Sequence, residues 1–403
     1  MTAKTSVSTR SAIEDRVITF GANLAAIPER LLLAHARGEV LFVCGAGISR
    51  PANLPDFREL VLDVYHALDA GVHSVLVSVP QGACSQRDVD CSSLTDRQRA
   101  EVQRFIVSDY DVVLGMLERR LDDQTRGDSG VRREVAKRLR AGKSNPAPIH
   151  RAIVRLADRG AATAVVTTNF DLLLEAAGKR LRKEIGTYSL GSIPRPTRQK
   201  EFAGVLHIHG ALDTNPARNS ELVLSDQDFG EFYLRRRVVP DFIYDAARLF
   251  HLVLVGYSAN DPPMRYLLNA VAADGSRFDD LKERFTFLGT SRPDPVALED
   301  SKARSITPIH YDDRNDHAIL HETLKRWADF SAINGRQRAL DAEIRRIVKS
   351  GWAAASESDR DHFDHLIRRS NAGERVRQSA LASDAKADLG WLDAIVCADT
   401  VIT

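Results

Sequence analysis

Six short apolar runs, each ending in polar residues or a turn, constrain this chain more than any other feature. They are rich in valine, isoleucine, leucine and phenylalanine, and the segments between them repeat apolar residues at helical spacing. Strands that alternate with helices form a parallel sheet covered by helices on both faces. The sequence therefore predicts a doubly wound α/β fold with about six strands, at residues 40–44, 163–166, 205–208, 252–255, 284–289 and 306–311.

The first run ends in the glycine turn Gly45-Ala46-Gly47-Ile48-Ser49. Its glycines lack the Cβ atoms that would keep a phosphate from the backbone, and the following N–H groups can point at such an anion. The turn has neither the third glycine of the G-x-G-x-x-G fingerprint nor a G-x-x-x-x-G-K-[ST] loop, so it matches neither an ordinary Rossmann dehydrogenase nor a P-loop NTPase. A cradle for a nucleotide phosphate is predicted, and a simple strand-to-helix turn is the alternative.

Three later runs also deliver polar groups at their carboxyl ends. They end in Thr167-Thr168-Asn169-Phe170-Asp171, in His209-Gly210 and in the segment from Gly256 through Ser258 to Asp261. Ligands of open parallel α/β sheets bind outside the carboxyl ends of the strands, so we expect these clusters to converge on one crevice. Without the other motifs, Asn169 would be read as an ordinary turn former after a strand, and His209 as a core histidine in an apolar segment. His207 falls on the same strand face as His209 by alternation, but the adjacent Gly210 favours His209.

In this order of motifs the chain resembles the sirtuin family. The resemblance covers roughly residues 30 to 312 and rests on the G-A-G-x-S turn, the Pro55-Asp56-Phe57-Arg58 stretch, the Asn169 motif, the His209-Gly210 pair and the late G-x-S turn. Asn53 stands where a glycine is usual, Thr168 replaces a glutamine and Phe170 an isoleucine. The resemblance implies a mostly parallel, Rossmann-like NAD-binding sheet.

The resemblance also implies a role for each matching residue. Asn169 would hold the ribose hydroxyls and a water, and His209 would act as general base, which suits an imidazole whose ordinary pKa of about 6.5 lies near working pH. Asp171 would contact the nicotinamide amide, Phe57 the ribose side, and Arg58 a phosphate. The implied NAD-binding set is Gly45, Ala46, Gly47, Ser49, Asp56, Phe57, Arg58, Thr168, Asp171, Gly256, Ser258 and Asp261. Asp261 is equally suited to cap the next helix.

The four cysteines, Cys44, Cys84, Cys91 and Cys397, form no Cys-x-x-Cys pair. A four-thiolate zinc site of the kind found in protein-deacylating sirtuins cannot be assembled, so no metal is expected. The chain then resembles the zinc-free, NAD-consuming sirtuin-like domains of bacterial antiphage defence, above all those paired with HerA-type translocases. This implies an NAD+ hydrolase that depletes NAD under the control of assembly or a partner. A zinc-free deacylase or ADP-ribosyltransferase, and a module that senses NAD or ADP-ribose without turnover, are the alternatives.

The composition of the chain limits the kinds of partner that it can bind. The chain has 56 basic and 55 acidic residues and a net charge of +1, which gives no electrostatic case for direct nucleic-acid binding. No run reaches the roughly 20 apolar residues of a membrane span, and the unpatterned cysteines fit a reducing compartment. We expect a cytoplasmic enzyme with a loose amino-terminal arm. Arg235-Arg236-Arg237 is expected to be a solvated face.

Residues 1–312 are expected to form the NAD-binding and hydrolase domain, with a helical insert at about 60–150 that forms a lid, an oligomer surface or a packing layer. Ile13 to Arg37 predicts an amphipathic helix before the first strand. Residues 313–403 predict a helical region for assembly or partner contact. Its apolar end, Trp391 to Val396, either folds back or meets another chain, and we favour a homo-oligomer.

Overall fold

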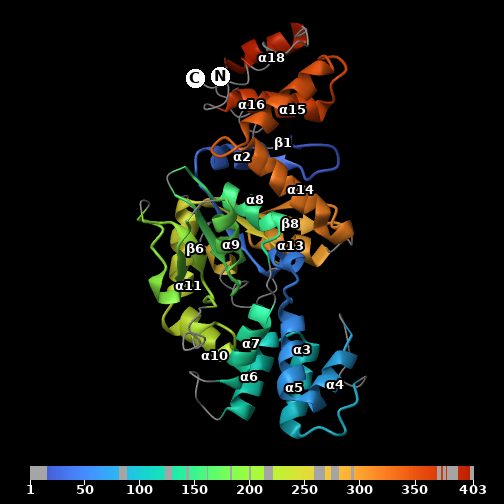
Figure 1. Ribbon diagram of the computed structural model, residues 1–403, viewed down its shortest axis with the longest axis vertical. Helices are drawn as coiled ribbons and strands as arrows, with labels where there is room; N and C mark the ends of the chain where they lie inside the picture. The colour runs from blue at the N-terminus through green and yellow to red at the C-terminus, as the bar shows by residue number, and fades with distance from the viewer. Residues whose placement is uncertain are drawn as a thin grey trace, which may run out of the picture.

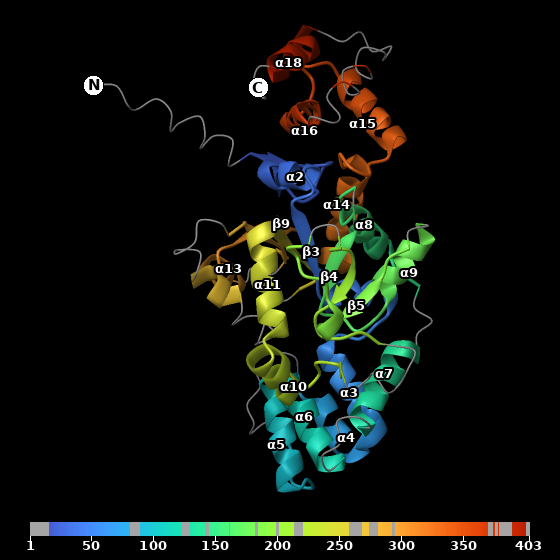
Figure 2. The same cartoon turned by 90° about the vertical axis from the view of Figure 1, so that its left-hand side faces the viewer.

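The fold is described from a computed structural model of the chain (Figures 1 and 2). The structure describes residues 16–80, 89–122, 129–141, 145–160, 162–181, 184–198, 201–212, 221–257, 268–273, 281–291, 295–369 and 389–399, together with residues 374 and 378.

A seven-stranded sheet in the order β5-β6-β4-β3-β7-β8-β9 forms the centre of the molecule, and all its neighbouring strands are parallel. The strands are β3 (Val40–Cys44), β4 (Ala164–Thr167), β5 (Thr187–Ser189), β6 (Gly204–His207), β7 (His251–Val255), β8 (Arg284–Gly289) and β9 (Ile306–Tyr311). The predicted α/β class and the six predicted strands are confirmed. The additional strand, β5, lies at one edge of the sheet.

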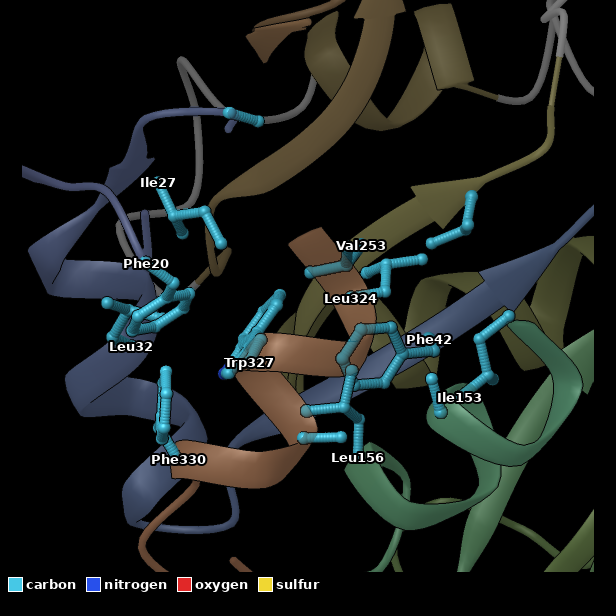
Figure 3. Close-up of a cluster of buried hydrophobic side chains, with 14 of the residues drawn as sticks. Phe20, Ile27, Leu32, Phe42, Ile153, Leu156, Val253, Leu324, Trp327 and Phe330 are labelled. Carbon is cyan, nitrogen blue, oxygen red and sulfur yellow. The ribbon is translucent and has the colours of Figure 1, made fainter. Parts of the chain in front are cut away.

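Helices cover both faces of the sheet. Alternate residues of β3 enter two separate apolar clusters, Phe42 on one face and Leu41 and Val43 on the other. The first cluster is closed by α2 (Glu29–Ala36), α8 (Pro148–Leu156), α9 (Leu173–Arg180) and α14 (Arg314–Phe330). In it, Trp327 packs against Phe42 with ring centroids 5.6 Å apart (Figure 3). The second face is covered by α11 (Val238–Leu249), and α13 (Pro295–Ala303) lies beside β9.

The helix predicted for residues 13–37 is wrong over most of its length. Residues 17–18 and 27–28 instead form a small antiparallel pair, β1 (Val17–Ile18) and β2 (Ile27–Pro28), and only α2 is helical. Gly21 and Asn23 have positive φ, at 153° and 63°, and Pro28 forms the N-cap of α2. These residues interrupt a helix because their backbones do not continue its dihedral angles.

The segment after β3 folds into a helical module, whose described α-helices are α3 (Phe57–Leu68), α4 (Ala70–Ser78), α5 (Asp96–Ile106), α6 (Tyr110–Leu121) and α7 (Gly130–Ala141). The module has an apolar core of its own, built around residues such as Val61, Tyr65 and Phe105. It lies beyond the carboxyl ends of the strands, because β3 runs from α2 towards α3 (Figure 2). A short segment, α10 (Asp226–Phe229) followed by the π-helix η7 (Gly230–Arg235), connects this end to α11.

The carboxyl-terminal helices lie at the opposite end of the molecule, as Figure 1 shows. They are α15 (Gln337–Lys349), α16 (Glu357–Arg368) and α18 (Leu389–Asp399), so the predicted helical tail is confirmed. Trp391 is fully buried and packs its ring against Phe363 and Trp352, with centroids 4.6 and 4.9 Å away. The terminal apolar cluster therefore folds back onto its own chain through Trp391, whereas Val396 is exposed. No described helix is long and apolar enough to cross a membrane.

Candidate active site

The carboxyl ends of four neighbouring strands lie at the same level, on the side of the sheet that faces the helical module (Figure 2). The register pairs Cys44 with both Thr167 and Val255, and Thr167 with His207. From β3 the chain passes first to β4 on one side and later to β7 on the other. Such a switch point is where open α/β sheets bind ligands.

The glycine turn packs against the end of β7. The N–H groups of Gly45 and Gly47 donate to the carbonyls of Val255 and Gly256 at 3.0 and 2.9 Å, and the next two N–H groups donate back into the turn. A Cβ atom on Gly45 would lie 2.6 Å from the Gly256 carbonyl oxygen. The glycines thus let two strand ends approach closely, and the N–H groups of residues 47–49 donate within the protein. The binding of a phosphate at this turn stays a prediction.

Gly45→Ala is expected to destabilise the protein by about 1–3 kcal/mol, because the added methyl group meets backbone that cannot move like a side chain. Gly191→Ala is the matched control, since a Cβ atom there meets nothing within 4 Å. The free energy of unfolding of both variants, from chemical denaturation, checks the prediction. Equal stabilities of the two variants would contradict it.

Asn169 follows β4 and contacts the glycine turn directly. Its carboxamide nitrogen donates to the Gly45 carbonyl at 3.1 Å and to Ser49 Oγ at 3.0 Å, and its own N–H donates to Thr167 Oγ1 at 3.0 Å. The residue is half-buried, so its side chain lies at the edge of the packed core. The structure therefore brings together the turn and the asparagine that the sequence placed in one crevice.

Asp171 completes this cluster. Its two carboxylate oxygens accept hydrogen bonds from Ser49 Oγ at 2.8 Å and from the Leu173 N–H at 3.0 Å. Burial raises the pKa of Asp171, although both hydrogen bonds act in the opposite direction. In this structure Ser49 donates to Asp171 and is not turned towards a phosphate. Thr168 is half-buried, and its N–H donates to the Cys44 carbonyl at 3.0 Å.

His209 lies just beyond β6, among aromatic side chains. Its Nε2 is 2.7 Å from the Tyr233 hydroxyl, and its ring meets the Phe229 ring edge-on at 5.5 Å. The loop that carries His209 is joined to the Asn169 loop, since the Leu212 N–H donates to the Phe170 carbonyl at 2.8 Å. Burial lowers the pKa of His209 from the ordinary value of an imidazole to about 3 in this state of the protein.

The two histidines near the end of β6 do not share surroundings, contrary to the simple alternation expected. His207 contacts Glu175 of α9, whereas His209 contacts residues of α10 and η7. The strand ends at His207, so the two-residue period no longer holds beyond it.

The Pro55–Arg58 stretch begins the helical module. Asp56 is the N-cap of α3: its carboxylate accepts from the Glu59 N–H at 2.8 Å and pairs with Arg50 at 3.0 Å. Arg58 donates to the Val79 carbonyl at 2.7 Å and lies over the Phe105 ring. These contacts are structural, and the assignment of Asp56 and Arg58 to NAD binding stays a prediction. Phe57 likewise packs within the module, with its ring 5.9 Å from that of Tyr110.

The late turn is described only in part. Gly256 has a φ of 63°, and a Cβ atom on it would lie 2.5 Å from the Ile48 nitrogen, so this position requires glycine. The predicted contacts of Ser258 and Asp261 lie outside the described residues.

Sequence reasoning missed two residues of this region. Tyr233 contacts His209, but it comes from a π-helix whose position no motif indicates. Glu175 contacts His207 at 2.9 Å. It follows Asp171 by four residues, so helical spacing after the Asn169 motif could have pointed to it.

Two charged features elsewhere are already paired. Arg235 and Arg236 bind Glu231, as expected of a solvated face. A hollow of about 460 Å³ at the carboxyl-terminal helices is lined by Arg16, whose guanidinium pairs with Asp361 and Asp364 of the same hollow. Among the described residues, no group of three or more His, Cys, Asp or Glu side chains is placed to hold a metal ion.

Comparison with known families identifies the central part of the chain. Residues 163–309 match the model of the SIR2-like domain. Over this span the chain is similar to the SIR2-like domain. The match includes Asn169, His209 and Gly256, whereas the glycine turn of residues 45–49 precedes it. Domains of this type are typical of enzymes that use NAD.

The chain is also similar to the uncharacterized protein y4cA of Sinorhizobium fredii (strain NBRC 101917 / NGR234), with 32% identity over 370 residues. The similarity covers 85% of this chain but only 28% of that relative, so the chain spans little more than a quarter of its length. A solved structure described as "Structural Basis for the Mechanism and Regulation of Sir2 Enzymes" is similar at 15% identity and a TM-score of 0.32, covering 75% of this chain and 95% of that one.

Proposed function

We propose that this protein is an NAD+ hydrolase that cleaves nicotinamide from NAD+ and releases ADP-ribose. The proposal rests on the convergence of Asn169 and His209 at the carboxyl ends of neighbouring strands. These are the two residues that the sirtuin resemblance assigns to catalysis, and the Leu212–Phe170 hydrogen bond joins their loops. The SIR2-like domain supplies the expectation of NAD as substrate.

The reaction breaks the bond between C1′ of the ribose and the nicotinamide nitrogen, and the electron pair leaves with nicotinamide. A water oxygen forms the new bond to C1′ on the opposite face, and one proton of that water is transferred to a base. A carboxamide such as that of Asn169 offers both a donor and an acceptor to ribose hydroxyls and to water. His209 is neutral at working pH, so its imidazole can accept the proton.

Hydrolysis is favoured over protein deacylation because the sequence lacks the paired cysteines of the deacylase zinc module. Two alternatives remain as outcomes of one experiment. A deacylase or ADP-ribosyltransferase would leave ADP-ribose attached to an acyl group or a protein, and a sensor would return intact NAD.

The pH dependence of kcat/KM is expected to show no acid limb near pH 6.5. A base acts in its neutral form and fails as the pH falls through its pKa, and burial lowers that pKa of His209 to about 3. Activity from pH 7 down to pH 5 should therefore not follow the titration of an ordinary histidine. A limb centred near 6.5 that disappears in His209→Gln would contradict this prediction.

The experiment that tests the function is incubation of the purified full chain with NAD+, with separation of nicotinamide, ADP-ribose and cyclic products. It is performed on the chain alone and together with a HerA-type ATPase. Stoichiometric release of nicotinamide and free ADP-ribose is expected in at least one assembly. No release in any assembly, with Asn169→Ala and His209→Ala indistinguishable from the parent chain, would contradict the proposal.

We further propose that NAD depletion serves antiphage defence and is held inactive until a trigger or partner acts. Unrestrained NAD cleavage would deplete the cell that makes the enzyme, so this activity requires control. A homo-oligomer and a HerA-type translocase are the assemblies we favour, in a cytoplasmic setting. Most of the relative y4cA lies outside the similarity to this chain, so that protein has further segments beside the part that matches.

A further inference from the structure

His207, the last residue of β6, is fully buried, and both of its ring nitrogens face hydrogen-bond acceptors. Nδ1 lies 2.8 Å from the Asn169 carbonyl oxygen, and Nε2 lies 2.9 Å from Glu175 Oε1. A neutral imidazole carries one N–H and can donate to only one of them, whereas an imidazolium donates to both. The geometry therefore favours the doubly protonated ring.

Glu175 makes a second contact through the oxygen that faces His207. Its Oε1 also accepts a hydrogen bond from Thr187 Oγ1 of β5 at 2.9 Å, so the oxygen that faces His207 serves as an acceptor. Burial acts to lower the pKa of His207, but the hydrogen bond and the negative charge of Glu175 outweigh it, and the pKa is raised. The negative charge of Asp171 also raises the pKa of His207, by a smaller amount.

The His207 imidazole contacts Asn169, one of the two residues to which the proposed function assigns catalysis. Its Nδ1 side holds the carbonyl of Asn169, while Thr167 Oγ1 holds the N–H of the same residue. Both backbone groups of Asn169 are thus fixed, and the carboxamide is directed to Ser49 and the glycine turn.

We propose that His207 is a buried imidazolium, paired with Glu175, that positions Asn169 for the reaction. The inference rests on the proposed NAD hydrolase function and adds a positioning residue to it. The charged groups that face His207 are Glu175 from α9 and Asp171 from the loop after β4. Because the pKa of His207 is raised on folding, its stabilising effect is complete below about pH 6.5 and is lost as the pH rises through the folded value.

Glu175→Gln separates charge from shape. The glutamine carboxamide can donate to Nε2 or accept from it, so a neutral His207 shares its one proton between Nε2 and Nδ1, and its hydrogen bond to the Asn169 carbonyl is weakened. The turnover number at pH 8 is expected to fall about tenfold to a hundredfold with little change in KM, as for a displaced catalytic group. Activity should recover as the pH is lowered and His207 gains its proton. A purely structural defect would give a loss that does not depend on pH.

Two readouts of the full chain decide the proposal. In nitrogen NMR of histidine-labelled protein at pH 7.5, His207 should carry protons on both ring nitrogens in the parent chain and on one in Glu175→Gln, with His207→Gln used for assignment. This readout needs no NAD turnover, so it is informative even if the proposed function fails. A neutral His207 in the parent chain, or parental turnover with an unshifted pH profile in Glu175→Gln, would overturn the proposal.

Discussion

Replacing Asn169 by alanine is expected to lower the rate of nicotinamide release by at least about a hundredfold. The carboxamide contacts the glycine turn through Gly45 and Ser49, and the half-buried Asn169 follows the carboxyl end of β4. Alanine removes a group that can orient both the ribose and the attacking water. Nicotinamide release by the purified variant at saturating NAD+ measures the effect.

Asn145→Ala is the matched control for this variant. Asn145 is an exposed asparagine whose side chain accepts a hydrogen bond from Arg180. It should retain the parental rate, and both variants should show the parental circular dichroism and thermal midpoint. A folded Asn169→Ala protein that turns over NAD+ at the parental rate would remove Asn169 from the mechanism.

The strands of the sheet could be predicted because their residues are buried on both faces. The run Val40–Cys44 is apolar throughout and enters two cores, so composition alone marks it. The edge strand Thr187–Ser189 is half-exposed and polar, and it carries no such signal. The helix before Arg37 was wrongly predicted for a different reason. The apolar residues there do have helical spacing, but the backbones of Gly21 and Pro28 interrupt the helix.

The sequence could predict where the candidate residues lie relative to the strands, but not all of their contacts. Asn169 and His209 follow strands whose ends the register aligns, which the parallel arrangement dictates. The sequence could not tell that the turn uses its N–H groups against β7, because that depends on how closely two strand ends approach. Nor could it tell that His209 is surrounded by Phe229 and Tyr233, whose placement depends on a π-helix.

The surroundings of His209 depend on the helical module through one buried ion pair. Arg132 of α7 donates to Asp228 Oδ2 at 2.6 Å and to the Leu222 carbonyl at 2.8 Å. The same carboxylate oxygen accepts from the N–H groups of Leu224 and Ser225, so it shapes the start of α10. Phe229 ends that helix and contacts His209. The module is therefore tied to the segment that encloses the proposed base.

Asp228→Ala is expected to destabilise the protein by about 1.5–3 kcal/mol, because it removes the hydrogen bond from the buried Arg132 guanidinium to Asp228 and leaves Glu118 as the other charged partner of Arg132. Both side chains are only 1% exposed, so water cannot replace the lost contact. Asp226→Ala is the control: that aspartate pairs with Arg119 at the surface, where an ion pair contributes at most about 1 kcal/mol.

The free energy of unfolding measures this loss, and the double variant Arg132→Met with Asp228→Ala tests its cause. If the weakened pairing of the guanidinium is responsible, the double variant should be more stable than Asp228→Ala alone, since methionine leaves no buried cation and Glu118, which is 14% exposed, stays within reach of water. A double variant that is less stable than Asp228→Ala would instead place the energy in the packing of Arg132. Because α10 carries Phe229 towards His209, the same variants should alter the edge contact of that ring, and a change in the His209 imidazole resonances would report it.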